Sequence, residues 1–298
     1  MTPIRLCENL RAVPYAPMYF ALGGSYFADA ALEISLQTAP STPETALALL
    51  RGDADISWGG PMRVLLHHDQ DGDCPLICFG SVVSRDPFLL LGRHPKPGFR
   101  FSDLVGLSVS IASDVPTPWM MFQDDVARQG VDPNSLVRHD DLPMSKAVEA
   151  FVNGEFDVIQ VFEPYADFLI EQAGAKIWHR FSDRGDIAYT TFYATRQFIA
   201  ENPDTCRRLM AAMERAVADF LIASVDEIAE RLQAFFPHFD RASLARMVER
   251  YRSAGLWSAR QAITPTALVR LKAALLSGGL LRRDTPYDRI VDTTLVNP

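Results

Sequence analysis

The stretch TPETALALLRGDADISWGGP, residues 42–61, contains one complete helix and the strand that follows it. Thr42 is the predicted N-cap, and Pro43 takes the first-turn position that suits a proline. The helix ends at Gly52, a residue typical of helix C-termini. Residues 55–58 are then predicted as a short strand that Gly59-Gly60-Pro61 ends. This order of helix and strand predicts an α/β layered fold.

The same alternation continues on both sides of this stretch. Helices are predicted at 18–22, from Trp119 and at 146–151, and from Pro203 the pattern is helical almost to the end. The chain has two successive blocks of strands and helices and then returns to the first block. This order predicts two lobes, each with a mixed sheet flanked by helices: residues 1–86 with 188–298, and residues 87–187. The further predicted strands are 4–8, 32–36, 76–83, 88–91, 108–112, 158–162 and 189–194.

Composition narrows the class of protein. A chain of 298 residues, 48% of them hydrophobic, is long enough for two lobes. A net charge of -8 argues against nucleic-acid binding, which needs clustered basic residues. No apolar run is long enough to span a bilayer. Pro3, Arg5 and Glu8 interrupt what would be the apolar core of a secretory signal. We therefore expect a periplasmic protein if a signal peptide has been removed, and otherwise a cytoplasmic one.

The order of segments resembles a known family, the substrate-binding proteins of ABC importers of the nitrate, sulfonate, taurine and thiamine-precursor type. The resemblance rests on five stretches in order, none of them specific alone. It implies a type II periplasmic-binding-protein fold, with a hinge and a ligand cleft between the lobes. The stretches are YAPMYFA at 15–21, GSYF with LEI at 24–34, the run from Ala46 to Asp55, DLVG at 103–106, and AFVNGEFD at 150–157 followed by Phe162-Glu163-Pro164.

Candidate ligand-binding residues follow from the predicted strands, because ligands of open α/β sheets lie beyond the carboxyl ends of the strands. Five loops qualify. Two glycines, Gly59 and Gly60, would let a ligand approach the backbone. Arg85 would bind a carboxylate or sulfonate, or else lie in solvent at the crossing. The full set is Asn9, Tyr15, Trp58, Gly59, Gly60, Arg85, Phe88, Ser113, Thr117, Trp119, Glu163, Asp186 and Tyr189.

The helix that begins near Trp119 is one candidate anion site, because free backbone N–H groups at a helix start attract anions. The resemblance implies the same, since family members that carry sulfonates use this helix start. Asp114 lies beside it and weakens the argument, and Ser113 and Thr117 would serve an ordinary N-cap equally well. Aromatic residues together with Glu163 and Asp186 instead favour a heteroaromatic or amino-bearing ligand over nitrate.

An enzyme on the same fold is the alternative. Fungal pyrimidine synthases of this fold carry a lysine and a histidine after the third strand, where this chain has Met62 and Arg63, and a cysteine-rich strand that 188–193 lacks. Related desulfinases use a cysteine, for which Cys7 would be the candidate. Neither Cys74 with Cys78 nor His67 with His68 has the spacing of a metal site. We predict no catalytic residue, no metal and no cofactor.

The predicted function is solute binding for an ABC-type importer, with hinge closure on a small organic ligand that is heteroaromatic or carries a sulfonate or carboxylate. The expected partners are that ligand and an ABC permease, with no nucleic acid and no membrane span. The alternatives are a cytoplasmic decarboxylase, desulfinase or thiamine-pyrimidine-type enzyme, and a sensor domain that binds the solute without transport.

Overall fold

The computed structural model describes residues 1–296 and contains two separate five-stranded mixed sheets. The first sheet has the order β2 (Leu32–Thr38), β1 (Thr2–Glu8), β3 (Ile56–Gly59), β10 (Thr190–Thr195) and β4 (Leu76–Val83). In it, β10 runs antiparallel to both of its neighbours, β3 and β4, while β1 is parallel to β2 and β3. We call this sheet and its helices the first lobe.

The second sheet repeats the design. Its order is β7 (Val137–His139), β6 (Ser108–Ser110), β8 (Val158–Val161), β5 (Leu89–Gly92) and β9 (Lys176–Arg180). Here β5 is the strand that runs antiparallel to both neighbours, β8 and β9, while β6 is parallel to β7 and β8. We call this sheet and its helices the second lobe. The predicted α/β class with two mixed sheets is confirmed.

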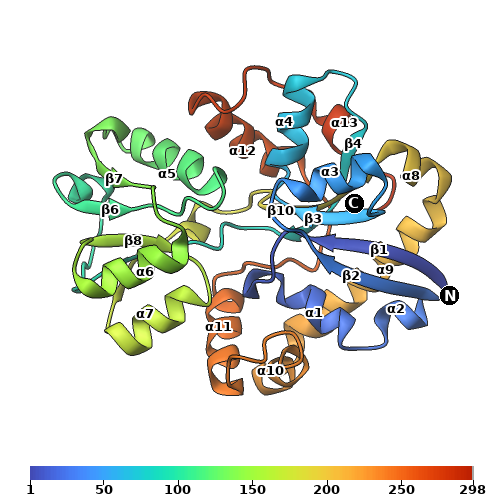
Figure 1. Cartoon of the computed structure of the whole chain (residues 1–298), viewed down its shortest axis with the longest axis horizontal. Helices are drawn as coiled ribbons and strands as arrows, with labels where there is room; N and C mark the ends of the chain where they lie inside the picture. Colours follow the sequence, from blue (N-terminus) through green and yellow to red (C-terminus); the bar gives the residue numbers. More distant parts are fainter. Residues whose placement is uncertain (297–298) are drawn as a thin grey trace.

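The lobes lie side by side, and the chain passes between the sheets twice, through residues 84–88 and 181–189 (Figure 1). The second passage contains the short helix η4 (Phe181–Arg184). The lobe boundaries at 86 and 188 stay predictions, because the sheets do not fix them to the residue.

Helices cover both faces of the first sheet. Helix α1 (Ala16–Leu22) is buried on almost all sides, whereas an amphipathic pattern buries one side of α9 (Pro203–Ile222). These two helices pack on each other and on α2 (Tyr26–Asp29). The α3 helix (Glu44–Arg51) packs on β1, β3 and β10, and α4 (Met62–Gln70) packs on β4. Gly52 ends α3 in the left-handed conformation, as predicted, with φ 76°. The helix starts later than predicted, because Pro43 and not Thr42 is its N-cap and makes no side-chain cap.

The edge strand β4 is buried along its whole length, which is unusual for an edge. The chain's end accounts for this burial. Helix α13 (Tyr287–Ile290) packs on β4, Val291 forms a parallel bridge with Cys78, and the Asp292 N–H donates to the Cys78 carbonyl at 2.8 Å. The C-terminal residues therefore shield an edge that would otherwise be free to pair.

The second lobe is covered by α5 (Thr117–Arg128), α6 (Met144–Asn153) and α7 (Tyr165–Ala173). The strands β7 and β9 and the helix α7 were not predicted from the sequence. The remaining first-lobe helices are α8 (Arg196–Glu201) and α10 (Val225–Leu232). Among residues 1–296, no helix combines the length and the apolar character that crossing a bilayer requires.

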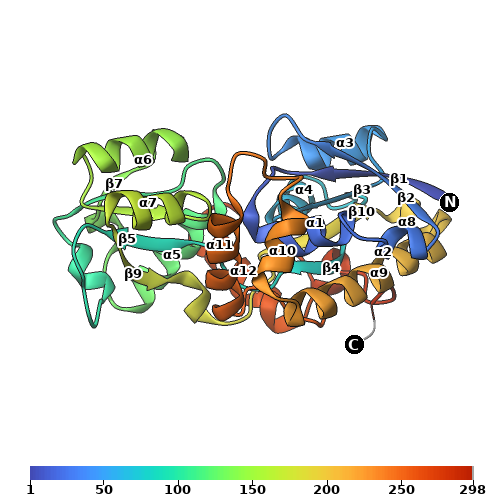
Figure 2. The same ribbon diagram turned by 90° about the horizontal axis from the view of Figure 1, so that it is seen from below.

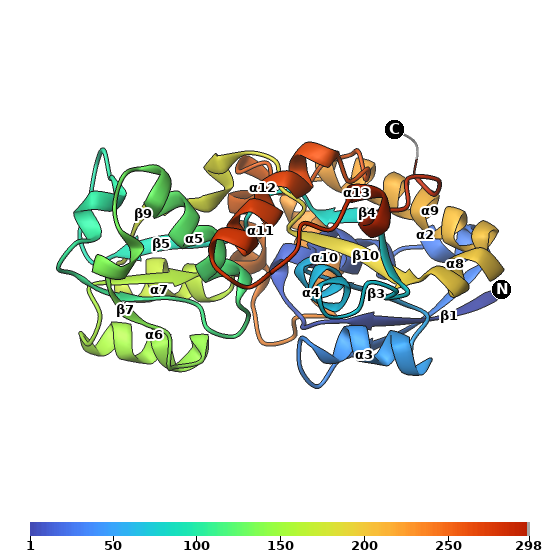
Figure 3. The same ribbon diagram turned by 90° about the horizontal axis from the view of Figure 1, so that it is seen from above.

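The two longest helices near the chain's end, α11 (Arg241–Ser253) and α12 (Pro265–Ser277), lie between the lobes rather than on the first lobe alone (Figure 2). The α11 helix packs on α7 and α12 packs on α5, both of the second lobe. Figure 3 shows the same central position from above. The last third of the chain therefore contacts both lobes beside the two crossings.

Candidate functional site

A pocket lies where the two lobes meet, with about 540 Å³ of space when the part open to solvent is included. The first lobe contributes the loop after β1 and the start of α4, and the second lobe contributes the residues before α5 and after β8. Its lining is Asn9, Leu10, Ala12, Pro14, Tyr15, Gly60, Met62, Arg63, Pro87, Phe88, Val115, Thr117, Phe162, Tyr189 and Thr190.

Strand direction explains why these segments converge. The strands β1, β3, β6 and β8 end at Glu8, Gly59, Ser110 and Val161, and the lining follows each of these ends. Parallel strands bring their carboxyl ends to one edge of a sheet, so each sheet presents its loops to the other lobe. The two crossings add Pro87, Phe88 and Tyr189.

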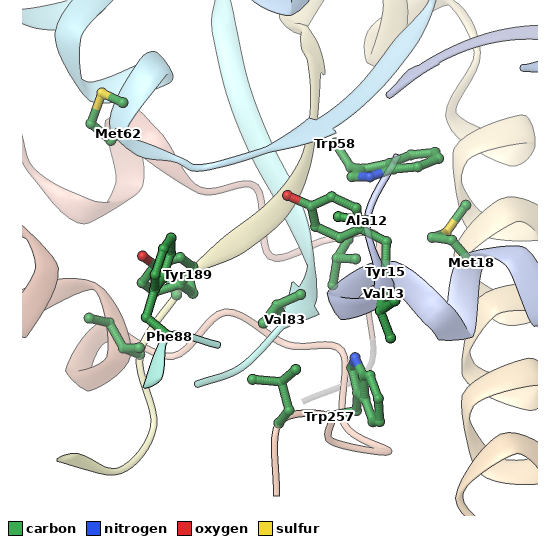
Figure 4. Close-up of a cluster of buried hydrophobic side chains, with 14 of the residues drawn as sticks. Ala12, Val13, Tyr15, Met18, Trp58, Met62, Val83, Phe88, Tyr189 and Trp257 are labelled. Atoms are coloured by element: carbon green, nitrogen blue, oxygen red, sulfur yellow. The ribbon is translucent and has the colours of Figure 1, made fainter. Parts of the chain in front are cut away.

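Six of the predicted ligand residues line this pocket, namely Asn9, Tyr15, Gly60, Phe88, Thr117 and Tyr189. In the cluster of buried side chains in Figure 4, Phe88 and Tyr189 lie together at the left, and Tyr15 lies with Ala12 to the right of them. The rings of Phe88 and Tyr189 have centroids 6.3 Å apart. Burial raises the pKa of both Tyr15 and Tyr189, so these two hydroxyls keep their protons at neutral pH.

Trp58 and Gly59 lie behind the lining. The Trp58 side chain is 0% exposed and meets the Tyr15 ring edge-on at 6.0 Å, so it supports a pocket residue rather than lining the pocket itself. A Cβ at Gly59 would lie 2.8 Å from Nη1 of Arg63. This glycine therefore makes room for a side chain of the protein.

Five further predicted residues have partners elsewhere. Arg85 Nε lies 3.1 Å from Asp186, whose side chain is 75% exposed, and its Nη1 donates to the Ala254 carbonyl. Ser113 Oγ donates to the Leu142 carbonyl at 2.6 Å, and Trp119 stacks on Phe122.

Glu163 is the fifth of these residues. Its side chain is 0% exposed, pairs with Arg250 of α11, and accepts from the Asp167 N–H at 2.8 Å. Burial, only partly offset by Arg250, raises the pKa of Glu163 to about 7.

Arg63 is the lining residue with the most distinctive chemistry, and the sequence did not single it out as a ligand residue. It stands in the first turn of α4 and is 6% exposed. Within residues 1–296, no carboxylate lies within 4.0 Å of its guanidinium, and its side chain donates no hydrogen bond to the protein. The signal in the sequence was an arginine just after Gly59-Gly60-Pro61, at the end of a buried strand.

Glu8, the last residue of β1, fixes the position of the loop that begins at Asn9. Its fully buried carboxylate accepts hydrogen bonds from Tyr19 at 2.6 Å, from Thr38 at 2.6 Å and from Arg11 at 2.8 Å. Three donors on one carboxylate fix the point where β1 turns into the pocket lining. Glu8 is therefore a positioning residue for Asn9 and the residues after it.

Two fully buried polar atoms of lining residues have no hydrogen-bond partner within residues 1–296. They are the hydroxyl of Tyr189 and Oδ1 of Asn9, whose amide nitrogen donates to the Tyr15 hydroxyl at 3.1 Å. A buried polar group without a partner costs about 1–3 kcal/mol. Both atoms therefore have unused hydrogen-bonding capacity at residues that line the pocket.

Cys7 shows none of the features of an activated nucleophile. Burial and the neighbouring Glu8 raise the pKa of its thiol, whereas a reactive cysteine needs a lowered one. Arg5, on the same strand, pairs with Asp55 at 2.6 Å. In the described part of the chain, no three His, Cys, Asp or Glu side chains are grouped as a metal site would require.

Comparison with known proteins agrees with this geometry. The sequence model described as "NMT1/THI5 like" matches residues 13–225. "Putative binding protein YtlA" of Bacillus subtilis (strain 168) is 23% identical over 296 residues, which cover 98% of this chain and 88% of that protein.

Two solved structures share the fold. The periplasmic aliphatic sulphonate binding protein SsuA of Escherichia coli superposes with a TM-score of 0.78 at 15% identity, over 97% of each chain. The alkanesulfonate-binding protein SsuA of Xanthomonas axonopodis pv. citri, bound to MOPS, superposes with a TM-score of 0.75 at 14% identity, over 99% of each chain. The fold is thus that of type II periplasmic binding proteins, and this chain belongs to the NMT1/THI5-like family.

Proposed function

We propose that this chain is the solute-binding protein of an ABC-type importer, and that it closes its two lobes on a small organic molecule. One observation carries the proposal: a single pocket is lined by loops from both lobes and from both crossings. A ligand bound there contacts both lobes at once. It therefore stabilises the closed arrangement by the contacts that the open arrangement lacks.

The relatives support the coarse function. The Bacillus subtilis relative is named as a binding protein, and both solved neighbours are named for sulfonate binding. An ABC permease is the proposed partner, because delivery to a transporter is what a protein of this kind does after closure. The periplasm is the proposed location, by analogy with the Escherichia coli neighbour, which is named as a periplasmic protein.

An enzymatic role is the weaker candidate. The side chain best placed to act as a nucleophile, Cys7, is buried with a raised thiol pKa. The pocket residues with polar side chains are suited to hydrogen bonding and charge pairing rather than to bond cleavage.

The test combines ligand identification with a measurement of shape. The protein is purified gently, its retained small molecules are identified by native mass spectrometry, and each is added back to stripped protein during small-angle X-ray scattering. We expect at least one solute to bind in a 1:1 ratio and to reduce the radius of gyration. Saturating binding with unchanged scattering would contradict the hinge, and chemical turnover of the solute would favour the enzyme.

A further inference from the structure

Buried arginines elsewhere in this protein have acidic partners. Arg184 pairs with Asp86 and Asp125, and Arg250 pairs with Glu163 and Asp167. Arg63 is as deeply buried, with 6% exposure, yet no carboxylate of residues 1–296 lies within 4.0 Å of it. The contrast marks Arg63 as a buried arginine without an acidic partner among residues 1–296.

An unpaired charge in the interior is unfavourable. Removing a guanidinium from water costs several kcal/mol, and proteins normally offset this cost with a paired anion and hydrogen bonds. Arg63 bears that cost on the wall of the proposed ligand pocket. Gly59 leaves space for its Nη1, which a Cβ would approach to 2.8 Å. The local structure thus accommodates the guanidinium but does not neutralise it.

A second, independent observation points to a guest at the same place. The Tyr189 hydroxyl and Asn9 Oδ1 are buried on the lining without a partner. The rest of the lining is largely apolar, with Met62, Phe88 and Phe162 among the larger side chains. One cation, two free polar atoms and apolar walls together describe a guest with a charged head and a hydrocarbon body.

We propose that Arg63 binds the oxyanion head, a carboxylate or a sulfonate, of a small organic solute whose apolar body contacts Met62, Phe88 and Phe162. The inference rests on the proposed function and names its ligand class. A guanidinium suits both heads, because its parallel N–H groups bind two oxygens of one group. Bare nitrate or sulfate would leave the apolar walls without a partner.

The proposed anchor lies on the first lobe, not at the start of α5 where the family resemblance placed it. At that start Ser113 donates to the Leu142 carbonyl, and Asp114 accepts from the Met144 N–H at 3.1 Å. Thr117 alone of the predicted donors there lines the pocket. The solute would therefore bind the first lobe through its charge before the second lobe closes.

The experiment uses matched pairs of probes on the full chain. Hexanoate, benzoate, hexanesulfonate and benzenesulfonate are titrated by calorimetry beside hexanamide, benzamide, hexanesulfonamide and benzenesulfonamide, with sodium nitrate and sodium sulfate as inorganic anions. We expect acids of at least one head group to bind and the neutral partners not to bind. Carboxylates and sulfonates form separate arms, so the experiment also decides which head group is preferred.

Four variants identify the arginine. Arg63→Gln should weaken the best acid about 100-fold, because a buried charge loses its partner, and Arg63→Lys should retain part of the affinity. Arg51→Gln removes an exposed charge that pairs on the surface with Glu44, and should bind as the wild type does. Arg85→Gln tests the arginine that the sequence analysis named as a candidate for binding a carboxylate or sulfonate. Without ligand, Arg63→Gln should be no less stable than wild type, since it removes an unpaired buried charge.

Several outcomes would overturn the inference: amides that bind as tightly as acids, an unchanged affinity in Arg63→Gln, loss of binding in Arg85→Gln instead, or no binding by any acid. Another outcome is a retained neutral or cationic solute that reduces the radius of gyration of wild type and Arg63→Gln equally. That result would support the proposed function and contradict the proposal that the ligand is an anion. No compaction with any solute or probe would remove the proposed function itself.

Discussion

Gly59 shows how the absence of one methyl group positions a charged side chain on the pocket wall. Its backbone is ordinary strand, so another residue would be allowed by its dihedral angles. The space beyond its Cα, however, is occupied by Arg63 Nη1 and by the Tyr193 hydroxyl, which would lie 3.0 Å from a methyl group added there. That hydroxyl is fixed by its hydrogen bond to Thr45 Oγ1 at 2.6 Å.

Gly59→Ala should therefore push the guanidinium from its position. We expect the affinity for the solute to fall about tenfold and the free energy of unfolding to fall by about 1–3 kcal/mol, the usual cost of overpacking. Calorimetry and urea denaturation measure the two effects. Gly72→Ala is the control, because a methyl group there meets nothing within 4 Å. Equal affinities in the two variants would contradict the contact.

Glu163 permits a prediction about pH. Its carboxyl pKa is about 7 in the folded protein, raised by burial from an ordinary value of 4.5. The folded state therefore binds a proton that the unfolded state has released between these values, so stability should fall as the pH rises from 4.5 to 7. Relative to Glu163→Gln, the unfolding free energy of the wild type should fall by about 3 kcal/mol between pH 4.5 and 7.

Urea denaturation at several pH values measures that difference, since other titrating groups are common to both proteins. Asp86, whose pKa burial raises to about 6, should act in the same direction in both. A constant difference between wild type and Glu163→Gln from pH 4.5 to 7 would show that Glu163 stays ionised in the folded state.

The site was predictable from sequence as a set of loops, and less so as a set of side chains. Strand ends indicated the loops after β1, β3, β6 and β8, because apolar runs and the breaks after them are local signals. Local sequence does not show whether Arg63 or Arg85 is free to bind a ligand. The answer depends on Asp186, which is 101 residues from Arg85 and accepts its hydrogen bond.

At the scale of elements, buried strands were predicted well and edge strands were missed. Residues 76–83 were predicted as a strand and form β4 with the same bounds. The strands β7 and β9 lie at the two edges of the second sheet, and their side chains are mostly half-buried or exposed. Edge strands lack the apolar pattern that two covered faces impose, so periodicity does not reveal them.

The sequence did not indicate that α11 and α12 contact both lobes. An apolar stripe shows that a helix is buried, but it does not show which lobe covers it. The polar side chains of α11 and α12 make the connection. Arg250 of α11 pairs with Glu163 and Asp167 of the second lobe, and Arg270 of α12 pairs with Asp125 of α5 at 2.8 Å. Arg184, in the second crossing, bonds Asp125 as well.

Arg270→Gln should loosen α12 from α5. Its Nη1 also donates to the Arg184 carbonyl at 3.1 Å, so the substitution removes two links between the lobes. We expect a larger radius of gyration without ligand, and a loss of about 1 kcal/mol in unfolding free energy because the pair is partly exposed. Arg207→Gln, which breaks an ion pair within α9, is the control in scattering and denaturation. Identical scattering from both variants would contradict the link.

On the scale of the whole molecule, the two lobes have four physical connections: two covalent crossings and two helices that contact both sides. A hinge made only of the two crossings would bend in many directions. If the proposed hinge closure takes place, contacts at α7 and α5 would restrict that freedom and favour one path of opening and closing. The lobes were predictable from the strand pattern, whereas the bridging required the three-dimensional packing of the chain's last third.

The covered margin of the first sheet has a practical consequence. Because Val291 and its neighbours occupy the side of β4, shortening the chain before them would leave a bare row of N–H and C=O groups on which a second copy could add its own strand. Met1, by contrast, is 77% exposed and lies at the far end of the first lobe from the second (Figure 1). Immobilising the protein on a surface through Met1 would therefore leave the pocket between the lobes accessible to solvent.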